Sequence, residues 1–181
     1  LLANSGLTDA GKTFTGWTVN GTLYQPGSTV VLTGKSTAYA TWKATDFSAA
    51  SEKFALTLGT GTFTYNAKSQ IPAIRVTRAG KELTADTDYT ISYSNTNTAA
   101  GRGASNTINA GTVTVTVTGK GGYSGTLTDT YQIARAELNV RWLTAKDRVY
   151  DGSNTVQLNT DEARLEGIFA DAAGKQDDVV L

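Results

Sequence analysis

The 181-residue chain contains no cysteine, no histidine and no methionine, and it has only 2 prolines. It therefore lacks the commonest general base, the thiolate nucleophile and the usual ligands of zinc and other transition metals. Lysine plus arginine and aspartate plus glutamate are 16 each, so the formal net charge is +0. A balanced charge lacks the basic footprint of a nucleic-acid-binding protein. These absences argue against thiol, histidine and transition-metal chemistry and against a nucleic-acid partner.

The chain also lacks a long hydrophobic run. Hydrophobic residues make up 39% of the sequence, which is enough for folded cores, but they form no stretch that would span a membrane as a helix. Residues 1–6 have neither the basic start nor the apolar core of a signal peptide. We therefore expect an internal or processed piece of a longer protein, with no membrane span in this segment.

Threonine, glycine, asparagine, serine and valine set the texture of the chain, and this composition favours strands and tight turns over helices. In residues 112–118 valine alternates strictly with threonine, which is typical of an antiparallel strand with one buried face. Shorter alternations occur in residues 74–77 and 89–93. Helical periodicity is weak, and its best candidate is a short helix within residues 160–169. The sequence predicts the all-β fold class.

Glycine-containing pairs mark the chain reversals. Asn20-Gly21 stands between two short apolar stretches, and it is the strongest hairpin signal because both residues accept a positive φ. Pro26-Gly27, Ala79-Gly80 and residues 119–122 indicate further turns.

Two boundaries and one repeat organise the chain. Residues 43–51 are small, polar and unpatterned, which is typical of a linker between modules. A second boundary falls near residues 134–135, where one strand passes almost directly into the next. Tyr65 and Tyr150, 85 positions apart, each follow an alternating strand and precede a turn. If one module has that length, the chain begins and ends inside a repeat.

Residues 11–17 read Gly-Lys-Thr-Phe-Thr-Gly-Trp, and Tyr24, Gly27 and the sequence Tyr-Ala-Thr-Trp at residues 39–42 follow. Over residues 7–44 this pattern resembles the second half of a Listeria-Bacteroides repeat, of the internalin B-repeat type. We expect large aromatic residues to form the core, because little else fills so small a module. They are Trp17, Tyr24, Tyr39 and Trp42.

The middle of the chain is similar to the extracellular repeats known as MBG or bacterial Ig-like modules. The resemblance is carried by residues 65–72, 87–95 and 110–126. The chain departs from the pattern at Ala67, where the family usually has glycine. It departs again at residues 96–107, which we interpret as an inserted loop.

The last part of the chain resembles the opening half of a YDG-type repeat. Residues 145–152 end in Val-Tyr-Asp-Gly, and residues 165–167 and 177–181 fit the continuation. Tyr65 and Tyr150 stand just before turns, where we expect each ring to be buried and each hydroxyl to bond to backbone.

The resemblances imply a division into four segments. These are a partial Listeria-Bacteroides-type repeat (residues 1–44), a linker (45–52), an MBG or bacterial Ig-like module (53–134) and the opening part of a YDG-type module (135–181). They imply small β-grasp-like and β-sandwich-like modules in an extended array, in a cell-surface protein of Gram-positive bacteria. None of these families implies a catalytic residue.

Candidate catalytic and phosphate sites have structural alternatives that we favour. Residues 33–36 end like a phosphate-binding loop, but Thr29 stands where that motif needs glycine. A glycosidase needs two carboxylates, and the available pairs lie in turn-like segments where aspartate commonly bonds to nearby backbone. The candidates are Asp86 with Asp88, Asp161 with Glu162, and Asp171 with Asp177 and Asp178.

Calcium and covalent cross-links are further options. Residues 151–155 superficially resemble a calcium-binding loop but lack its later acidic positions, so a capped turn is the favoured interpretation. An intramolecular isopeptide bond needs a buried lysine beside a carboxylate or amide, whereas the lysines sit mostly at turns. Examples are Lys12, Lys35, Lys81 and Lys120.

Two features are candidates for ligand binding. Trp142, next to Arg141, has the aromatic surface to stack a carbohydrate or a protein ligand, and the favoured alternative is that it packs in a core or between modules. The loop from Asn95 to Asn106, rich in asparagine, threonine, alanine and glycine, either reaches a partner or is a tolerated insertion.

We therefore expect a monomeric, non-catalytic spacer or stalk segment of an extracellular, cell-wall-associated multi-module protein, most simply an adhesin. No catalytic, cofactor or metal site is expected, and the ligand, if there is one, is unknown. Two alternatives stay open: a module that itself binds a host protein or glycan, and an accessory region of a secreted enzyme. The expected partners are neighbouring modules, with no nucleic acid.

Overall fold

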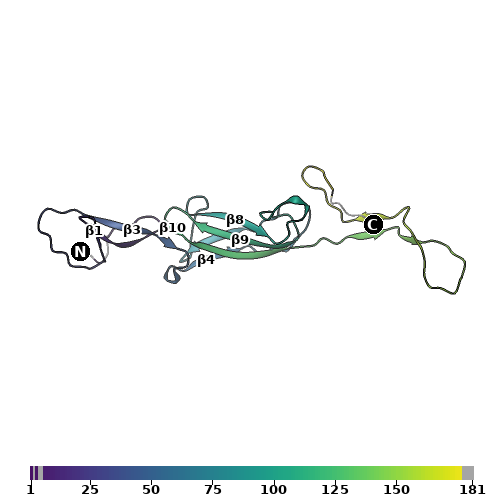
Figure 1. Ribbon diagram of the computed structural model, residues 1–181, viewed down its shortest axis with the longest axis horizontal. Helices are drawn as coiled ribbons and strands as arrows, with labels where there is room; N and C mark the ends of the chain where they lie inside the picture. Colours follow the sequence, from purple (N-terminus) through teal and green to yellow (C-terminus); the bar gives the residue numbers. More distant parts are fainter. Residues whose placement is uncertain (2, 4–5, 177–181) are drawn as a thin grey trace. The chain divides into compact units, whose positions relative to one another are not determined.

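A computed structural model describes residues 1, 3 and 6–176. The described residues form fifteen strands and two 3-10 helices of three residues each, without an α-helix (Figure 1). The predicted all-β fold class is confirmed. No helix in this part of the chain has the length and hydrophobicity that crossing a membrane requires.

The chain divides into two compact units, each assembled from stretches that are distant in sequence. The first unit contains Leu1–Thr60, Pro72–Ser94 and Thr114–Tyr131. The second contains Gly61–Ile71, Asn95–Val113 and Gln132–Leu181. The predicted succession of modules at 1–44, 53–134 and 135–181 stays a prediction.

The first unit opens with an antiparallel sheet that follows the predicted hairpin. β1 (Lys12–Val19) and β2 (Thr22–Tyr24) pair so that Val19 lies opposite Thr22. The two turn residues, Asn20 and Gly21, have φ angles of 48° and 82°, which is the backbone that a two-residue hairpin turn requires. The Asn20-Gly21 hairpin is confirmed.

The long strand β3 (Ala38–Asp46) completes this sheet and leads out of it. β3 pairs antiparallel with β1, with a register shift between Phe14 and Gly16. Gly16 has a φ of 147°, and a Cβ at that position would overlap the carbonyl oxygen of Tyr24, so only glycine fits. On its other side β3 pairs in parallel with β10 (Tyr123–Ser124), which makes the strand order β10-β3-β1-β2.

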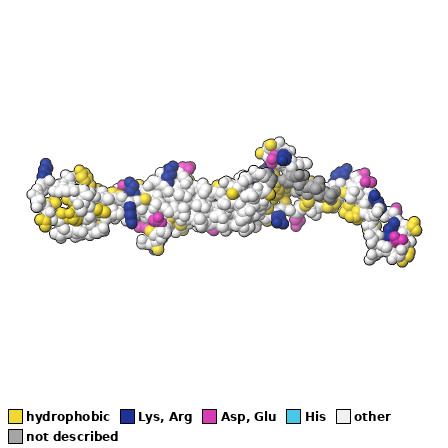
Figure 2. All heavy atoms as spheres, in the orientation of Figure 1, with side chains coloured by type: hydrophobic (Ala, Val, Ile, Leu, Met, Phe, Trp, Pro, Cys, Tyr) yellow, Lys and Arg dark blue, Asp and Glu magenta, His cyan; other side chains and the backbone are white. Residues whose placement is uncertain are grey.

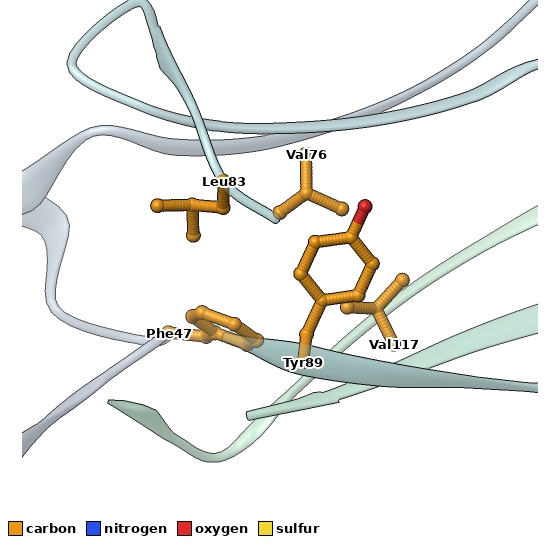
Figure 3. Close-up of a cluster of buried hydrophobic side chains, with 5 residues drawn as sticks. All are labelled: Phe47, Val76, Leu83, Tyr89 and Val117. Atoms are coloured by element: carbon orange, nitrogen blue, oxygen red, sulfur yellow. The ribbon is translucent and has the colours of Figure 1, made fainter. Parts of the chain in front are cut away.

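The core of the first unit lies between further strands. Phe47, Val76, Leu83, Tyr89 and Val117 form one buried cluster (Figure 3). Val76 belongs to β6 (Ile74–Arg78), which pairs antiparallel with β4 (Phe54–Leu58) and β7 (Lys81–Glu82), and Leu83 directly follows β7. Tyr89 belongs to β8 (Tyr89–Asn95) and Val117 to β9 (Gly111–Gly119).

The strand predicted from the alternation of valine and threonine is β9. Val113, Val115 and Val117 are each 0% exposed, which confirms that the valine face is buried. β9 lies between β8 and β11 (Thr126–Ala134) in a sheet of order β5-β11-β9-β8, where β5 is Phe63–Thr64.

The segment 45–52, interpreted from sequence as a linker, is packed along part of its length. Thr45 and Asp46 are the last residues of β3, Phe47 is 4% exposed, and the 3-10 helix η1 (Ala50–Glu52) follows. A small, polar composition does not reveal that one aromatic side chain anchors the segment in a core.

The second unit combines an asparagine-rich loop with two small sheets. The loop contains the 3-10 helix η2 (Ala99–Gly101). One sheet pairs β12 (Asn139–Arg141) with β15 (Arg164–Glu166), and the other pairs β13 (Thr144–Ala145) with β14 (Leu158–Asn159). β15 occupies the middle of residues 160–169, so the helix considered there is wrong.

Candidate functional site

The candidate carboxylates serve turns in the described part of the chain. Asp88 accepts a hydrogen bond from the backbone N–H of Thr84 at 2.8 Å. Asp171 accepts from the N–H groups of Ala173 and Lys175, both at 2.9 Å. Asp177 and Asp178, proposed as partners of Asp171, lie outside the described residues. Within those residues, no three acidic, histidine or cysteine side chains gather in a group that would hold a metal ion.

Asp161 and Glu162 lie in the turn before β15 and are both exposed. The N–H of Asp161 donates to the side-chain oxygen of Asn159 at 3.2 Å. Asp86, like Asp88, belongs to the turn that precedes β8, and its φ of 64° is accommodated there. The members of these carboxylate groups that the structure describes therefore lie in turns or cap them.

Residues 151–155 form a turn capped by Asp151. Its carboxylate accepts hydrogen bonds from the N–H of Ser153 at 2.9 Å and from the Arg148 guanidinium at 2.5 Å. Both bonds lower the pKa of Asp151, and the bond from Ser153 has the larger effect. The capped turn favoured from sequence is present. Tyr150, expected to be buried there, is 86% exposed, so that expectation is wrong.

Tyr65, the equivalent residue earlier in the chain, is half-buried and packs edge-on against Phe169, with ring centroids 6.0 Å apart. Ala67 follows at 3% exposure with a φ of 59°. Glycine adopts this left-handed backbone without strain, which gives a physical reason for the glycine that the resemblance leads one to expect at this position.

The aromatic residues of the first sheet pack around Phe14. Its ring meets Trp17 at 5.6 Å and Trp42 at 5.4 Å between centroids, both edge-on, which is a favoured arrangement for aromatic pairs. Tyr39 was expected in this core but is 65% exposed. Hydrophobic side chains are visible on the surface of the part of the molecule that carries β1 and β3 (Figure 2).

The named lysines make ordinary surface contacts. Lys12 forms an ion pair with Asp9 at 2.9 Å, and Lys120 donates to the carbonyl oxygen of Asp86 at 2.7 Å. Lys35 and Lys81 are exposed. None of the four has the buried position that an isopeptide bond needs.

The asparagine-rich loop folds around a polar core that the sequence did not predict. Asn95, Asn106 and Asn109 are 3%, 8% and 4% exposed. Asn95 donates to the carbonyl oxygen of Asn109 at 2.9 Å and to Asn106 at 3.2 Å. Asn109 donates to the carbonyl of Ala99 at 2.8 Å and accepts from Arg102 at 3.0 Å. The side chains at the two ends of this loop, interpreted from sequence either as reaching a partner or as a tolerated insertion, are therefore turned inward.

A cavity of about 710 Å³ lies beside this loop. It is lined in part by Asn97, Gly111, Gln132 and Arg135. Asn97 donates to the carbonyl of Ala110 at 2.9 Å, and its side-chain oxygen accepts from the N–H of Ala99. Gln132 donates to the hydroxyl of Thr112 at 2.8 Å. The side chains of Asn97 and Gln132 therefore already hydrogen-bond to the loop and to β9.

A second cavity, of about 420 Å³, contains the tryptophan singled out from sequence. It is lined by Trp142, Thr144, Asn159, Glu162 and Arg164. Trp142 is 64% exposed, so a core position within its own unit is wrong, and the other favoured alternative, packing between modules, stays a prediction. Sequence reasoning found Trp142 as an aromatic residue at a strand end. It named Glu162 only as a carboxylate candidate and missed Thr144, Asn159 and Arg164, because the pairing of strands brings residue 144 and residues 159–164 together.

No family model, curated protein or solved structure matches this chain.

Proposed function

We propose that the chain is a non-catalytic spacer or stalk segment of a bacterial multi-module protein that is secreted or attached to the cell surface. The basis for this function is the resemblance to Listeria-Bacteroides, MBG or bacterial Ig-like and YDG-type repeats. Because that resemblance implies cell-surface proteins, we propose that the segment lies outside the cell. The partners are neighbouring modules of the same polypeptide, and the segment acts as a monomer. The parent is an adhesin or, alternatively, a secreted enzyme for which this is an accessory region.

The observation that carries the proposal is the packed junction where β3 leaves the first sheet. The N–H of Thr45 donates to the carbonyl of Gly122 at 2.9 Å, and the N–H of Phe47 donates to the carbonyl of Ser124 at 2.9 Å. Between them, the Asp46 carboxylate accepts from the Ser124 hydroxyl at 3.2 Å. A spacer must transmit position from one neighbour to the next, and a junction bonded on consecutive residues resists bending.

Aromatic packing closes the same junction. Phe47 lies 4.9 Å from Phe54 and 5.9 Å from Tyr123 between ring centroids. Arg78 lies over the rings of Phe54 and Tyr123, and it pairs with Glu52 at 2.6 Å. Side chains from four chain segments therefore hold residues 45–47 in place.

The strand direction suits a load along the chain. β3 and β10 are parallel, with Thr45 opposite Tyr123 and Asp46 opposite Ser124. Their hydrogen bonds run across the strands, so a pull along β3 loads these bonds in shear and they must break together. This arrangement supports a mechanical role in preference to a flexible tether.

Stretching single molecules of the chain between two handles tests the proposal. We expect discrete unfolding steps, and we expect Phe47→Ala to lower the force at which the first unit unfolds, because truncating a buried phenylalanine costs about 3–5 kcal/mol. Leu23→Ala is the matched control, since Leu23 lies in β2 of the same unit and is 49% exposed. A chain that extends smoothly, without steps, would refute the spacer role.

A further inference from the structure

We propose that the cavity beside Trp142 is a binding site for a neutral carbohydrate chain, with one sugar ring stacked on the indole. The site goes beyond the spacer role and does not depend on it. It lies wholly within the second unit, and its lining residues come from the strands β13, β14 and β15 and the turns beside them.

The backbone at Trp142 has a positive φ. Its φ is 55°, and a bulky side chain in the left-handed region is a genuine outlier that costs free energy. Such conformations persist where the surroundings impose them, and they concentrate at ligand sites. Here the strain coincides with a large aromatic side chain that is 64% exposed, so burial of the indole does not compensate for it.

The strands on either side hold this residue in place. β12 ends at Arg141, where Arg141 and Glu166 form an ion pair at 2.8 Å across to β15. β13 begins at Thr144, opposite Asn159 of β14. Trp142 therefore lies between the end of β12 and the start of β13. Each of these two strands is paired with a partner strand in its own sheet.

The side chains around the indole are polar and available. Glu162 makes no hydrogen bond or ion pair within the described residues, and the same holds for the hydroxyl of Thr144. Asn159 accepts one bond from the N–H of Asp161 and keeps its amide N–H groups for a ligand. Arg164 donates one bond to the carbonyl of Ala163 at 2.9 Å and has further donors.

This combination fits a sugar better than other ligands. A pyranose has a face of C–H groups that packs on an aromatic ring and an edge of hydroxyls that both donate and accept hydrogen bonds. The cavity offers an indole face, one acceptor-only carboxylate and several donors. Its volume of about 420 Å³ falls within the usual range of small-ligand sites, about 300–1,000 Å³.

The charges argue for a neutral ligand. Glu162 and Arg164 contribute one negative and one positive charge, so neither an anionic nor a cationic ligand gains a net attraction. An apolar peptide segment laid on the indole would cover both charged groups without bonding to them, which is costly. A chain of hydroxyl-bearing rings satisfies both.

Titration of the whole chain with oligosaccharides tests the site. The probes are cellohexaose and chitohexaose, which are neutral with flat β-1,4-linked rings, and oligogalacturonate, which is anionic. We expect at least one neutral probe to bind at millimolar concentration or below and to change tryptophan fluorescence. We expect Trp142→Ala to abolish binding and Glu162→Gln to weaken it about tenfold, the usual loss for one hydrogen bond to a charged group.

Two further variants separate binding from folding. Trp142→Gly removes the indole and relieves the positive φ, so the melting temperature should not fall while binding is lost. Tyr150→Ala is the matched control, because Tyr150 is 86% exposed in the same unit and does not line the cavity. Binding that is unchanged in Trp142→Ala, binding of the anionic probe alone, or no binding of either neutral probe at millimolar concentration would each overturn the proposal.

Discussion

Asparagine side chains form the core of the loop between β8 and β9, whereas valine side chains form the buried face of β9 itself. Each buried amide of Asn95, Asn106 and Asn109 is held by hydrogen bonds to backbone or to another asparagine. Among the described residues, no buried side-chain nitrogen or oxygen lacks a partner, as a buried polar network requires. Sequence composition alone indicated a loose insertion, because asparagine marks turns whether or not its side chain is enclosed.

Tyr131 supplies a prediction at the same scale. Its partial burial, together with the nearby Tyr93, raises its pKa from 10.0 to about 12. The folded chain therefore keeps this proton where the unfolded chain has already lost it. Stability from this group is complete below pH 10.0 and is lost as the pH rises toward about 12.

Urea unfolding measured across this pH window checks the effect. We expect the free energy of unfolding to fall as the pH rises, and Tyr131→Phe to fall less steeply because the ring stays and the proton does not titrate. Tyr39→Phe, at a residue that is 65% exposed, is the control. Equal slopes for Tyr131→Phe and the unmodified chain would contradict this reading of Tyr131.

At the scale of elements, two hairpins share one geometry with different residues. Asn20-Gly21 joins β1 to β2, and Ala79-Gly80 joins β6 to β7 with Arg78 opposite Lys81. The φ angles are 48° and 82° in the first turn and 47° and 82° in the second. Asparagine tolerates the left-handed backbone better than alanine does, so the second turn is less well matched to its sequence.

Exchanging the two residue types tests this comparison. We expect Ala79→Asn to raise the free energy of unfolding by about 0.5–1 kcal/mol, and Asn20→Ala to lower it by a similar amount. Ala79 is exposed, so its substitution disturbs no core contact. Chemical denaturation of both variants gives the measurement, and a loss of stability in Ala79→Asn would show that the turn is governed by something other than φ.

The elements show where sequence reasoning succeeds and where it stops. The Asn20-Gly21 hairpin and the valine face of β9 were predictable, because turn chemistry and period-2 alternation are local rules. The pairing of β3 with β10, 78 positions away between Asp46 and Ser124, was not predictable, because no local rule names a partner. The same limit applies to the cavity at Trp142, whose lining is assembled by pairing between strands.

For the molecule as a whole, the confirmed statement is that the chain is all-β. The two compact units draw on segments separated by long stretches of sequence, whereas a tandem array predicts modules that follow one another along the chain. The spacer proposal rests on the junction at residues 45–47, where backbone bonds and aromatic packing restrain β3 as it leaves the first sheet.

The solution dimensions of the whole chain test the spacer proposal most directly. Small-angle X-ray scattering, with light scattering to confirm a monomer, measures the radius of gyration. A compact domain of this length would have a radius of gyration of about 16 Å. For a folded monomer we expect a radius of gyration clearly larger than this compact value. A radius of gyration close to about 16 Å would contradict the spacer proposal.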